Sequence, residues 1–493
     1  MRKIQIAAIT CLVAAFCAVP TPSSAQTFNT ILTFDGTNGA NVPSSLIQGI
    51  DGNFYGVTED GGKHGNGTVF KVSSSGQITT LYTFCPAAQC RDGRSPVGPL
   101  VQAADGTLYG VTMGGGAEGS GSIYALTPAG KLITAYSFCS ATNCTDGETP
   151  RAGLVLATNG NLYGTTSAGG AHRNGTIFQI TPAGKMTTLY NLCSQRSCAD
   201  GAQPYDALIQ ASDGKLYGTT FVGGLQDGGV IFSITTAGTF TTVANFCSQT
   251  GCAGGFNPYS GLIQAADGNL YGTAYFGGNC STCGTIYRTT TGGQLTTLYS
   301  FCAVNCLDGA SPLGGLVQAT DGSFYGTTQI GGSSNFFCIG GSASCGTIFE
   351  ITPQGTLTTL YNFCSLSVCA DGGNPAASLV QGTDGNLYGS TFYQGDFVCN
   401  NIGCGTIFSL SAGLGPFVQA SPGFGKVGSI INILGNNLTG TTSVTFNGVA
   451  AAFKVISNSD IKAKVPTGAT TGTIQVTTPT GTLSSNTAFQ ILP

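Results

Sequence analysis

The chain has 493 residues, of which 77 are glycines and only 8% are charged, and its formal net charge at pH 7 is −4. A chain with so little charge and no run of basic residues is poorly suited to neutralising the phosphates of a nucleic acid. Abundant glycine and threonine without a long helical pattern instead predict an all-β protein with many turns.

The first predicted element is a secretory signal peptide. Met1-Arg2-Lys3 is positively charged, an apolar run extends from Ile4 to Val19, and small residues at Ser23 and Ala25 suit a cleavage site. The apolar run is too short to span a membrane, and no later stretch is long enough. We therefore expect cleavage near Ala25 and an exported protein, extracellular or periplasmic, without membrane insertion. Loss of Arg2 and Lys3 lowers the 17 basic side chains to 15, against 21 acidic ones, a net charge of −6.

The following part of the chain, to about residue 410, is a repeat. The motif Asp-Gly-x-(Leu/Phe)-Tyr-Gly, with Asn for Asp in one copy, occurs seven times. Its tyrosines are spaced by 54 residues five times and by 63 residues once: Tyr55, Tyr109, Tyr163, Tyr217, Tyr271, Tyr325 and Tyr388. A fixed period of this length indicates one supersecondary unit that is copied and packed against its neighbours.

Each unit is predicted to form four short strands, which we name A to D in chain order. Strand A is a Leu-(Val/Ile)-Gln segment such as Leu208–Gln210; in the third unit strand B is Leu162–Thr166, strand C is Gly175–Ile180 and strand D is Met186–Leu192. The Asp-Gly pair between strands A and B marks a tight hairpin turn. Four-stranded units repeated around a ring form a β-propeller, so we predict an all-β, seven-bladed propeller.

A polar residue in an inner strand should be hydrogen-bonded. The strand A glutamines are therefore expected to tie neighbouring blades together or to line the axis. They occur in every unit except the third, which has Leu156: Gln48, Gln102, Gln210, Gln264, Gln318 and Gln381.

The number of strands predicts how the ring closes. Strands A, B and C occur seven times, but strand D occurs only six times, because the last unit stops at Gly405–Phe408. The segment Phe28–Phe34 has the sequence of the missing strand D. We predict that this N-terminal strand completes the seventh blade and removes open sheet edges. In the alternative blade, with the strands in the chain order D-A-B-C, no such closing strand would exist.

Eighteen cysteines remain after removal of the signal peptide, in nine neighbouring pairs. In an exported chain this pattern predicts nine local disulfides: Cys85–Cys90, Cys139–Cys144, Cys193–Cys198, Cys247–Cys252, Cys280–Cys283, Cys302–Cys306, Cys338–Cys345, Cys364–Cys369 and Cys399–Cys404. Cys280-Ser281-Thr282-Cys283 has a zinc-like spacing, but no second such pair and no nearby histidine accompany it. We expect neither a metal nor a cofactor.

The long connections, B–C and D–A, emerge on one face of an up-and-down blade and hold all nine pairs. Units five to seven have the longest B–C loops, and these loops carry aromatic side chains. Packing of longer loops explains these residues as well as a ligand patch does. As candidate ligand-binding residues we name Tyr275, Phe276, Phe336, Phe337, Phe392, Tyr393 and Phe397.

No catalytic constellation is evident. Most aspartates recur at equivalent turn positions, which indicates turn geometry. Glu59-Asp60 is the only adjacent acidic pair; it could serve a glycosidase, but a solvated loop is the favoured interpretation. The two histidines, His64 and His172, lie in equivalent loops without an acidic partner, so a Ser-His-Asp triad is not expected.

A second domain is predicted at residues 413–493, after a signal peptide at 1–25 and a propeller at 26–412. Its motifs include Pro422-Gly423-Phe424-Gly425, Gly435–Leu438 and Val444–Gly448. Across this whole segment the chain resembles the IPT/TIG family of immunoglobulin-like domains. The resemblance implies a β-sandwich that serves as a spacer or an interaction module.

The repeat resembles the GloVer tandem repeat of bacterial exported proteins over about residues 28 to 410. Leu-Tyr-Gly-Thr-Thr, Gly-Gly, Gly-Thr-Ile-Phe and the threonine-rich strand D carry the resemblance. It implies an exported protein but no established activity.

Our leading hypothesis is a non-enzymatic, monomeric, exported binding or scaffold protein. A glycan or a protein would bind its cysteine-rich face, and nucleic acid would not be a partner. A structural envelope or matrix protein without a specific ligand and a carbohydrate-active enzyme are the two alternatives.

Overall fold

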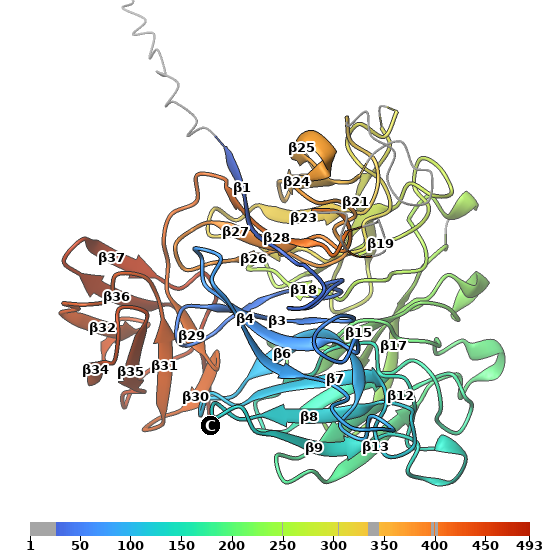
Figure 1. The fold of residues 1–493 in the computed structure, drawn as a ribbon, viewed down its shortest axis with the longest axis horizontal. Coiled ribbons are helices and arrows are strands. Elements are labelled where there is room, and N and C mark those ends of the chain that lie inside the picture. The colour runs from blue at the N-terminus through green and yellow to red at the C-terminus, as the bar shows by residue number, and fades with distance from the viewer. Residues whose placement is uncertain (1–25, 249, 304, 334–344, 396–398, 400–402) are drawn as a thin grey trace, which may run out of the picture.

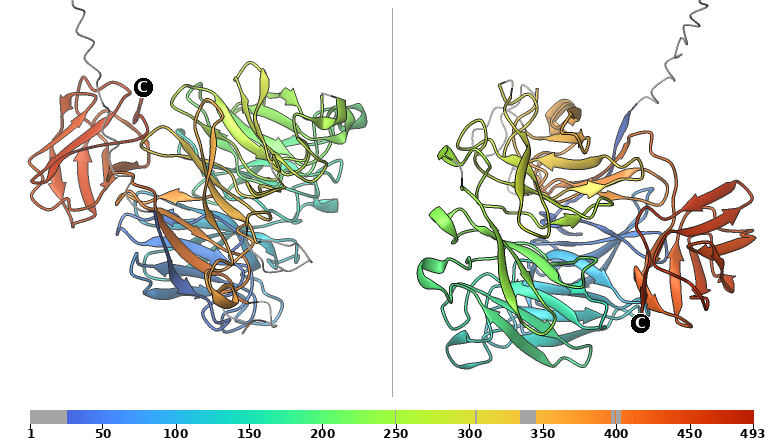
Figure 2. Two further views of the ribbon diagram at one scale, coloured as in Figure 1. Left: turned by 90° about the horizontal axis from the view of Figure 1, so that it is seen from above. Right: turned by 180° about the vertical axis from the view of Figure 1, so that it is seen from behind.

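The computed structural model describes residues 26–248, 250–303, 305–333, 345–395, 399 and 403–493. The chain forms seven four-stranded antiparallel sheets arranged as the blades of a propeller, followed by a β-sandwich (Figures 1 and 2). This confirms the predicted fold class. Among the described residues, no helix has the length and apolar character required to cross a membrane.

The first four blades follow the chain order A to D. Blade 1 contains β2 (Ile47–Gln48), β3 (Phe54–Thr58), β4 (Thr68–Val72) and β5 (Ile78–Thr83). Blade 2 contains β6 (Arg94–Gln102), β7 (Leu108–Gly114), β8 (Ser122–Leu126) and β9 (Leu132–Ser137). Blade 3 contains β10 (Val155–Leu156), β11 (Leu162–Thr166), β12 (Thr176–Ile180) and β13 (Met186–Asn191). Blade 4 contains β14 (Ile209–Gln210), β15 (Leu216–Thr220), β16 (Val230–Ile234) and β17 (Phe240–Asn245).

The remaining blades complete the ring. Blade 5 contains β18 (Ile263–Gln264), β19 (Leu270–Ala274), β20 (Thr285–Thr289) and β21 (Leu295–Ser300). Blade 6 contains β22 (Val317–Gln318), β23 (Phe324–Thr328), β24 (Thr347–Ile351) and β25 (Leu357–Asn362). Blade 7 contains β26 (Val380–Gln381), β27 (Leu387–Ser390), β28 (Thr406–Ser411) and β1 (Thr27–Thr33). Five short 3-10 turns lie in the loops: Thr142–Cys144, Arg196–Cys198, Leu225–Asp227, Thr250–Cys252 and Ser367–Cys369.

Blade 7 confirms the predicted ring closure and rules out the D-A-B-C alternative. Strand β1 pairs antiparallel with β28, from Thr27 opposite Ser411 to Thr33 opposite Thr406. The Phe28 ring stacks on Tyr361 of blade 6, with ring centroids 3.8 Å apart. The N-terminal strand therefore seals blade 7 and packs against blade 6.

The core consists of seven hydrophobic clusters, each shared by two neighbouring blades, and one further cluster inside the sandwich. The motif tyrosine and strand C aromatic of adjacent blades meet in these clusters, as Tyr55 and Tyr124 do between blades 1 and 2. The cluster between blades 7 and 1 contains Phe34, Phe54 and Tyr388. An apolar seam at every blade boundary explains why the repeated residues vary so little: each packs against a copy of its neighbours.

The strand A glutamines tie neighbouring blades together. In six of the seven boundaries the glutamine side-chain oxygen accepts a hydrogen bond from the A–B turn of the preceding blade, for example from the Ile50 amide to Gln102 at 3.0 Å. The amide of Thr383 in blade 7 donates to Gln48 of blade 1 at 2.9 Å, which closes the circle. Between blades 2 and 3 this hydrogen bond cannot form, because Leu156 occupies the position of the glutamine.

The C-terminal sandwich has two four-stranded sheets and one parallel pair. One sheet contains β29 (Gln419–Ser421), β31 (Ile430–Leu434), β35 (Asp460–Lys464) and β34 (Phe453–Val455). The other contains β33 (Val449–Ala450), β32 (Ser443–Phe446), β36 (Ile474–Thr478) and β37 (Gly481–Ser484). The parallel pair is β30 (Phe424–Lys426) with β38 (Gln490–Leu492).

The sandwich contacts the A–B turns of blades 7, 1 and 2. The Phe417 amide donates to the Thr383 carbonyl at 3.1 Å. The Asn432 side-chain amide donates to the Ala104 carbonyl at 3.2 Å. Ala104 lies in the A–B turn of blade 2, which lacks a glutamine partner because blade 3 has Leu156 at that position. The sandwich thus lies against the face of tight turns, which leaves the opposite face of the ring for the long loops (Figure 2).

A groove between blades 2 and 3 leads to a stability prediction. It has a volume of about 340 Å³ and is lined by Ala135, where other units have a larger residue such as Leu81 or Leu189. Replacing Ala135 by leucine should fill part of the groove and raise the free energy of unfolding by about 1 kcal/mol. The melting temperature measures this effect, with Ala129→Leu in an exposed turn as control. Equal shifts in both variants would contradict the assignment of the groove as a packing defect.

Candidate functional site

The face opposite the sandwich is braced by disulfides. Eight of the nine predicted pairs lie entirely within the described residues, and each is bonded. In the ninth pair, Cys345 is disulfide-bonded, whereas Cys338 lies outside the described residues. Multiple disulfides of this kind fit an extracellular or periplasmic protein.

The D–A loops are organised by a recurring aspartate as well as by their disulfides. In blade 3, the Asp200 carboxylate accepts hydrogen bonds from the Tyr190 hydroxyl at 2.9 Å, the Ser194 amide at 2.9 Å and the Gln195 amide at 3.1 Å. Asp146 and Asp371 make the same set of contacts. These recurring acids therefore shape the loops, as their equivalent positions predict.

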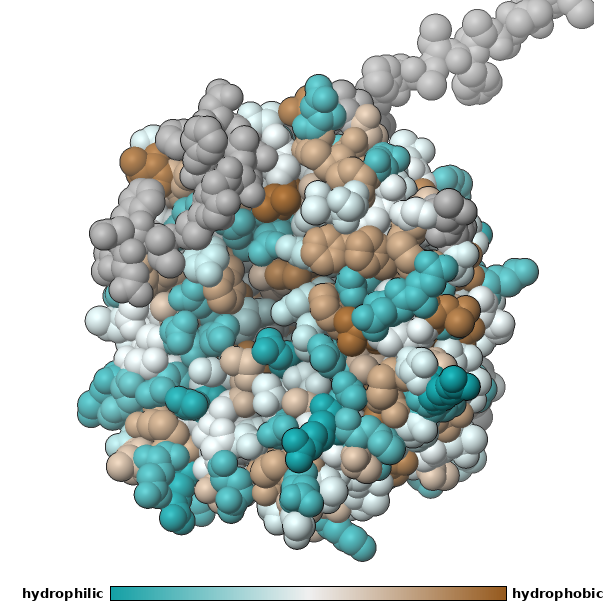
Figure 3. Space-filling model, turned by 90° about the vertical axis from the view of Figure 1, so that its right-hand side faces the viewer, coloured by the Kyte–Doolittle hydropathy of each residue, from teal (hydrophilic) through white to brown (hydrophobic). Residues whose placement is uncertain are grey.

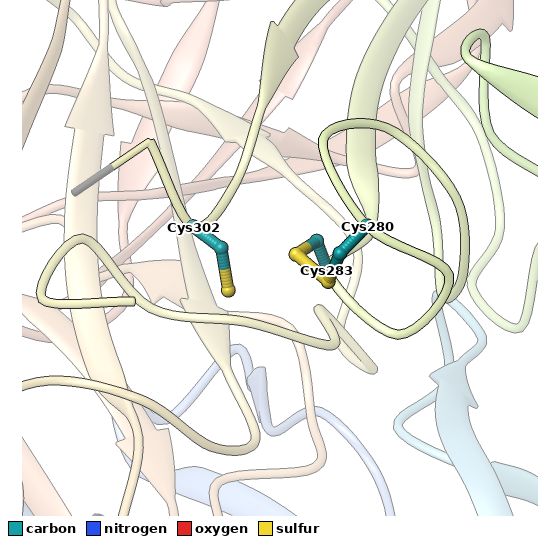
Figure 4. Close-up of side chains that lie close together, drawn as sticks. All are labelled: Cys280, Cys283 and Cys302. Carbon is teal, nitrogen blue, oxygen red and sulfur yellow. A yellow bond between two sulfur atoms is a disulfide. The ribbon is translucent and has the colours of Figure 1, made fainter. Parts of the chain in front are cut away.

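Sulfur atoms gather in blade 5, where those of Cys280, Cys283 and Cys302 lie within 4.8 Å of one another (Figure 4). Cys280 is bonded to Cys283, and Cys302 is bonded to Cys306. A thiolate is the cysteine form that binds metal, and none is present in bonded pairs. The cluster is therefore explained as two adjacent disulfides that brace neighbouring loops.

A cavity of about 270 Å³ opens at the centre of this face, on the propeller axis, where Figure 3 shows a hollow. One residue from every D–A loop lines it. In six units this residue directly follows a proline, and in the first unit it is Pro43 itself. The seven residues are Pro43, Val97, Arg151, Tyr205, Tyr259, Leu313 and Ala376.

In each D–A loop, the residue two positions before the lining residue directs the lining side chain toward the axis. Thr149 has a φ of 54°, and its six equivalents also have positive φ values. Its amide donates to the Ser120 carbonyl of the preceding blade at 2.9 Å, and its carbonyl accepts from the Ser167 amide at 3.1 Å. A non-glycine residue held in the left-handed region is strained, and such strain concentrates at ligand sites. The turn carries Arg151 into the cavity.

A second set of lining residues follows strand B. These residues occupy the fourth position after the motif tyrosine, which varies between units: Glu59, Met113, Ser167, Phe221, Tyr275, Gln329 and Phe392. Four of them, Glu59, Met113, Gln329 and Phe392, line the cavity, and so does Tyr393. Residues from two equivalent positions of the repeat thus converge on one cavity.

Aromatic side chains from blades 4 and 5 form one wall. Tyr205 stacks on Phe221 with centroids 4.8 Å apart, and Tyr259 lies 5.2 Å from Tyr205. Behind them, the centroid of Tyr275 is 6.1 Å from that of Tyr259, and its hydroxyl donates to Gln329 at 2.7 Å. The wall is held by ring contacts and by this hydrogen bond, which makes it rigid.

Charged groups of both signs meet the aromatic wall. The Arg151 guanidinium carbon lies 5.2 Å from the centroid of the Tyr205 ring. Burial and the neighbouring Asp60 carboxylate raise the pKa of Glu59, and Arg151 partly offsets this. Burial also raises the pKa of Asp206, although the amides of Ala207 and Gly261 donate hydrogen bonds to that carboxylate. The environment thus disfavours the charged form of each carboxyl.

The sequence-predicted residues divide into three groups. Phe392 and Tyr393 line the cavity. Tyr275 supports the wall from behind, and Phe276 instead stacks on Phe256 with centroids 5.4 Å apart. The other three fall outside the described residues: Phe336, Phe337 and Phe397. Glu59 lines the cavity, whereas Asp60, His64 and His172 are not among the lining residues.

Sequence reasoning missed Arg151, Tyr205, Asp206 and Tyr259. The signal that could have found Arg151, Tyr205 and Tyr259 is the alignment of the seven units with one another, in which the position after the proline varies between aliphatic, aromatic and cationic residues.

Comparisons with known proteins agree with the fold. The Gloeobacter/Verrucomicrobia repeat model matches residues 20–198 and 193–339, and the IPT/TIG domain model matches residues 418–491. No curated protein matches the chain. A solved structure of a fungal alcohol oxidase of the AA5 family, in complex with copper, is similar over 95% of this chain and 100% of that chain, with 13% identity and a TM-score of 0.55. A 6-phosphogluconolactonase-like protein from Bacteroides fragilis NCTC 9343 is similar over 73% of this chain and 99% of that chain, with 15% identity and a TM-score of 0.43.

Proposed function

Since this chain belongs to the Gloeobacter/Verrucomicrobia repeat family and carries an IPT/TIG domain, we propose that it is an exported binding protein whose ligand site is the axial cavity on the disulfide-braced face. One observation carries the proposal. Each of the seven D–A loops delivers the residue at one equivalent position to this cavity, and these side chains are aliphatic, aromatic or cationic, while the proline before them recurs in six of the seven units. Conserved geometry with a variable lining is the organisation expected of a recognition site on a rigid scaffold.

The lining favours binding over catalysis. A serine nucleophile needs an adjacent base, but the Ser44 hydroxyl in the lining makes no hydrogen bond within the described structure. The described lining contains neither histidine nor cysteine. The likeness to the alcohol oxidase, at 13% identity, concerns the fold alone, so its copper and its activity stay with that protein. We propose a non-enzymatic role.

Filling the cavity tests the proposal. Ala376, from blade 7, lines the cavity, so Ala376→Trp should obstruct it and abolish binding by removing the space the ligand needs. Ala117→Trp adds the same side chain to an exposed loop on the same face and should bind as the unchanged protein does. Binding is measured by calorimetry on hits from panels of glycans, small metabolites and peptides. Undiminished binding by Ala376→Trp would place the ligand site elsewhere and refute the proposal.

A further inference from the structure

We propose that the axial cavity binds one neutral pyranose unit, either a free sugar or the end of a glycan chain; this inference rests on the proposed function and names the ligand class. Size is the first argument. A cavity of about 270 Å³ is at the lower limit of ligand pockets, which span roughly 300–1,000 Å³. It suits one small ring and is too small to take a folded element of a partner protein.

The cavity has two chemically different sides. Tyr205 and Tyr259 come from blades 4 and 5, whereas Ser44 and Glu59 come from blade 1. In a ring of seven blades, blade 1 lies across the axis from blades 4 and 5. The aromatic wall therefore faces the hydrogen-bonding groups of blade 1, beside which Phe392 and Tyr393 of blade 7 also line the cavity. A pyranose matches this arrangement, because its C–H bonds form an apolar face that packs on aromatic rings while its hydroxyls radiate outward.

A buried hydroxyl on the polar side has no protein partner. Ser44 is only 4% exposed and lines the cavity, and its Oγ makes no hydrogen bond within the described structure. Buried polar groups are almost always satisfied, and rotation about the Cα–Cβ bond of Ser44 would turn its hydroxyl toward a molecule in the cavity. A serine hydroxyl both donates and accepts, as a sugar hydroxyl does. Ser44 thus points to a ligand rich in hydroxyl groups.

The charges favour a neutral ligand. Arg151 is accompanied by Glu59, and the two interact electrostatically. An anionic sugar would meet the Glu59 carboxyl, and a cationic one would meet the Arg151 guanidinium, so either charge would face one repulsive group. Carboxyl and guanidinium groups also bind neutral hydroxyls well, because they form charge-assisted hydrogen bonds.

Tyr259 provides the decisive variant. Tyr259→Ala removes the ring at the centre of the aromatic wall and should weaken binding by about tenfold or more. Tyr259→Phe keeps the ring and should bind within a few-fold of the unchanged protein. Ser44→Ala should weaken binding by roughly fivefold through loss of one hydrogen bond. Circular dichroism and melting temperature check that each variant is folded.

The full chain is tested by calorimetry against neutral monosaccharides and neutral, acidic and amino-sugar oligosaccharides. We expect binding of neutral sugars that is lost in Tyr259→Ala and in Ala376→Trp and kept in Tyr259→Phe. Binding of free monosaccharides identifies a free sugar as the ligand, and binding of oligosaccharides alone identifies a chain end. Cavity-dependent binding of only charged sugars, metabolites or peptides would overturn this inference and leave the proposed function standing. Neutral sugar binding that survives Ala376→Trp would overturn both.

Discussion

Deleting residues 26–36 should destabilise the propeller by roughly 5 kcal/mol or more, which is comparable to the whole stability of many domains. The deletion removes β1, so the edge of β28 is left unpaired. It also removes Phe34, which is fully buried between blades 7 and 1, and the Phe28 ring that stacks on Tyr361. Loss of one such aromatic from a core costs about 3–5 kcal/mol. Thermal unfolding of the deleted and complete chains measures the effect.

Point variants separate the apolar contribution of the strand from its backbone pairing. Phe28→Ala should lower the free energy of unfolding by about 3 kcal/mol, whereas Asn29→Ala, at an exposed neighbouring position on the same strand, should change it little. A peptide of residues 26–36 added to the deleted chain should restore part of the lost melting temperature by mass action. An unchanged melting temperature in the deleted chain would contradict the role of β1 in closing the ring.

The sequence predicted the fold well, because the fold is periodic. Seven copies of one motif fix the number of blades, and the missing seventh strand D identifies Phe28–Phe34 as the closing strand. Both conclusions need only the count and order of elements along the chain. The contact of the sandwich with the Ala104 turn could not be predicted, since it depends on how two independently folded surfaces meet.

The site was predicted only in part, for a physical reason. We expected the ligand residues in the longest loops, where the symmetry of the repeat breaks most visibly, and of these residues Phe392 and Tyr393 line the cavity. Arg151 and Tyr259 lie in D–A loops of ordinary length, two repeats apart in the sequence. They meet only because every D–A turn points to one axis. Loop length marks where the chain is elaborated, whereas variation at one position of the repeat marks the proposed ligand site.

A second large effect is expected at Asp200. This side chain is fully buried, and its carboxylate accepts hydrogen bonds from the Tyr190 hydroxyl and from the Ser194 hydroxyl and two amides of the D–A loop in blade 3. Asp200→Asn replaces one acceptor oxygen with an amide that can only donate, and so places donor against donor. Leaving buried groups unsatisfied in this way should cost about 2–4 kcal/mol at neutral pH. Hydrogen exchange at the Ser194 and Gln195 amides should accelerate, because these are the donors that lose their acceptor.

The pH dependence of this effect follows from the direction of the pKa shift. Although burial opposes ionisation, the hydrogen bonds from Ser194, Gln195 and Tyr190 lower the pKa of Asp200. A carboxyl whose pKa is lower in the folded than in the unfolded chain stabilises the fold above the unfolded value, about 3.9, and loses that contribution as the pH falls through the folded value. The pKa values of Asp51 and Asp267 are also lowered, so the A–B turns that hold them should lose the same kind of stabilisation in acid.

The free energies of unfolding of the unchanged protein and Asp200→Asn should therefore differ most at neutral pH and converge as the pH falls through the folded pKa of Asp200. Glu118→Gln, which removes one negative charge from an exposed loop of the same face, serves as the control and should change neither stability nor its pH dependence. If the difference between Asp200→Asn and the unchanged protein stayed constant from pH 7 to pH 2.5, the loss would come from packing, and the hydrogen-bonded carboxylate would not be what holds the loop. A convergence would identify the ionised aspartate, alongside the Cys193–Cys198 disulfide, as the group that fixes the loop from which Tyr205 enters the cavity.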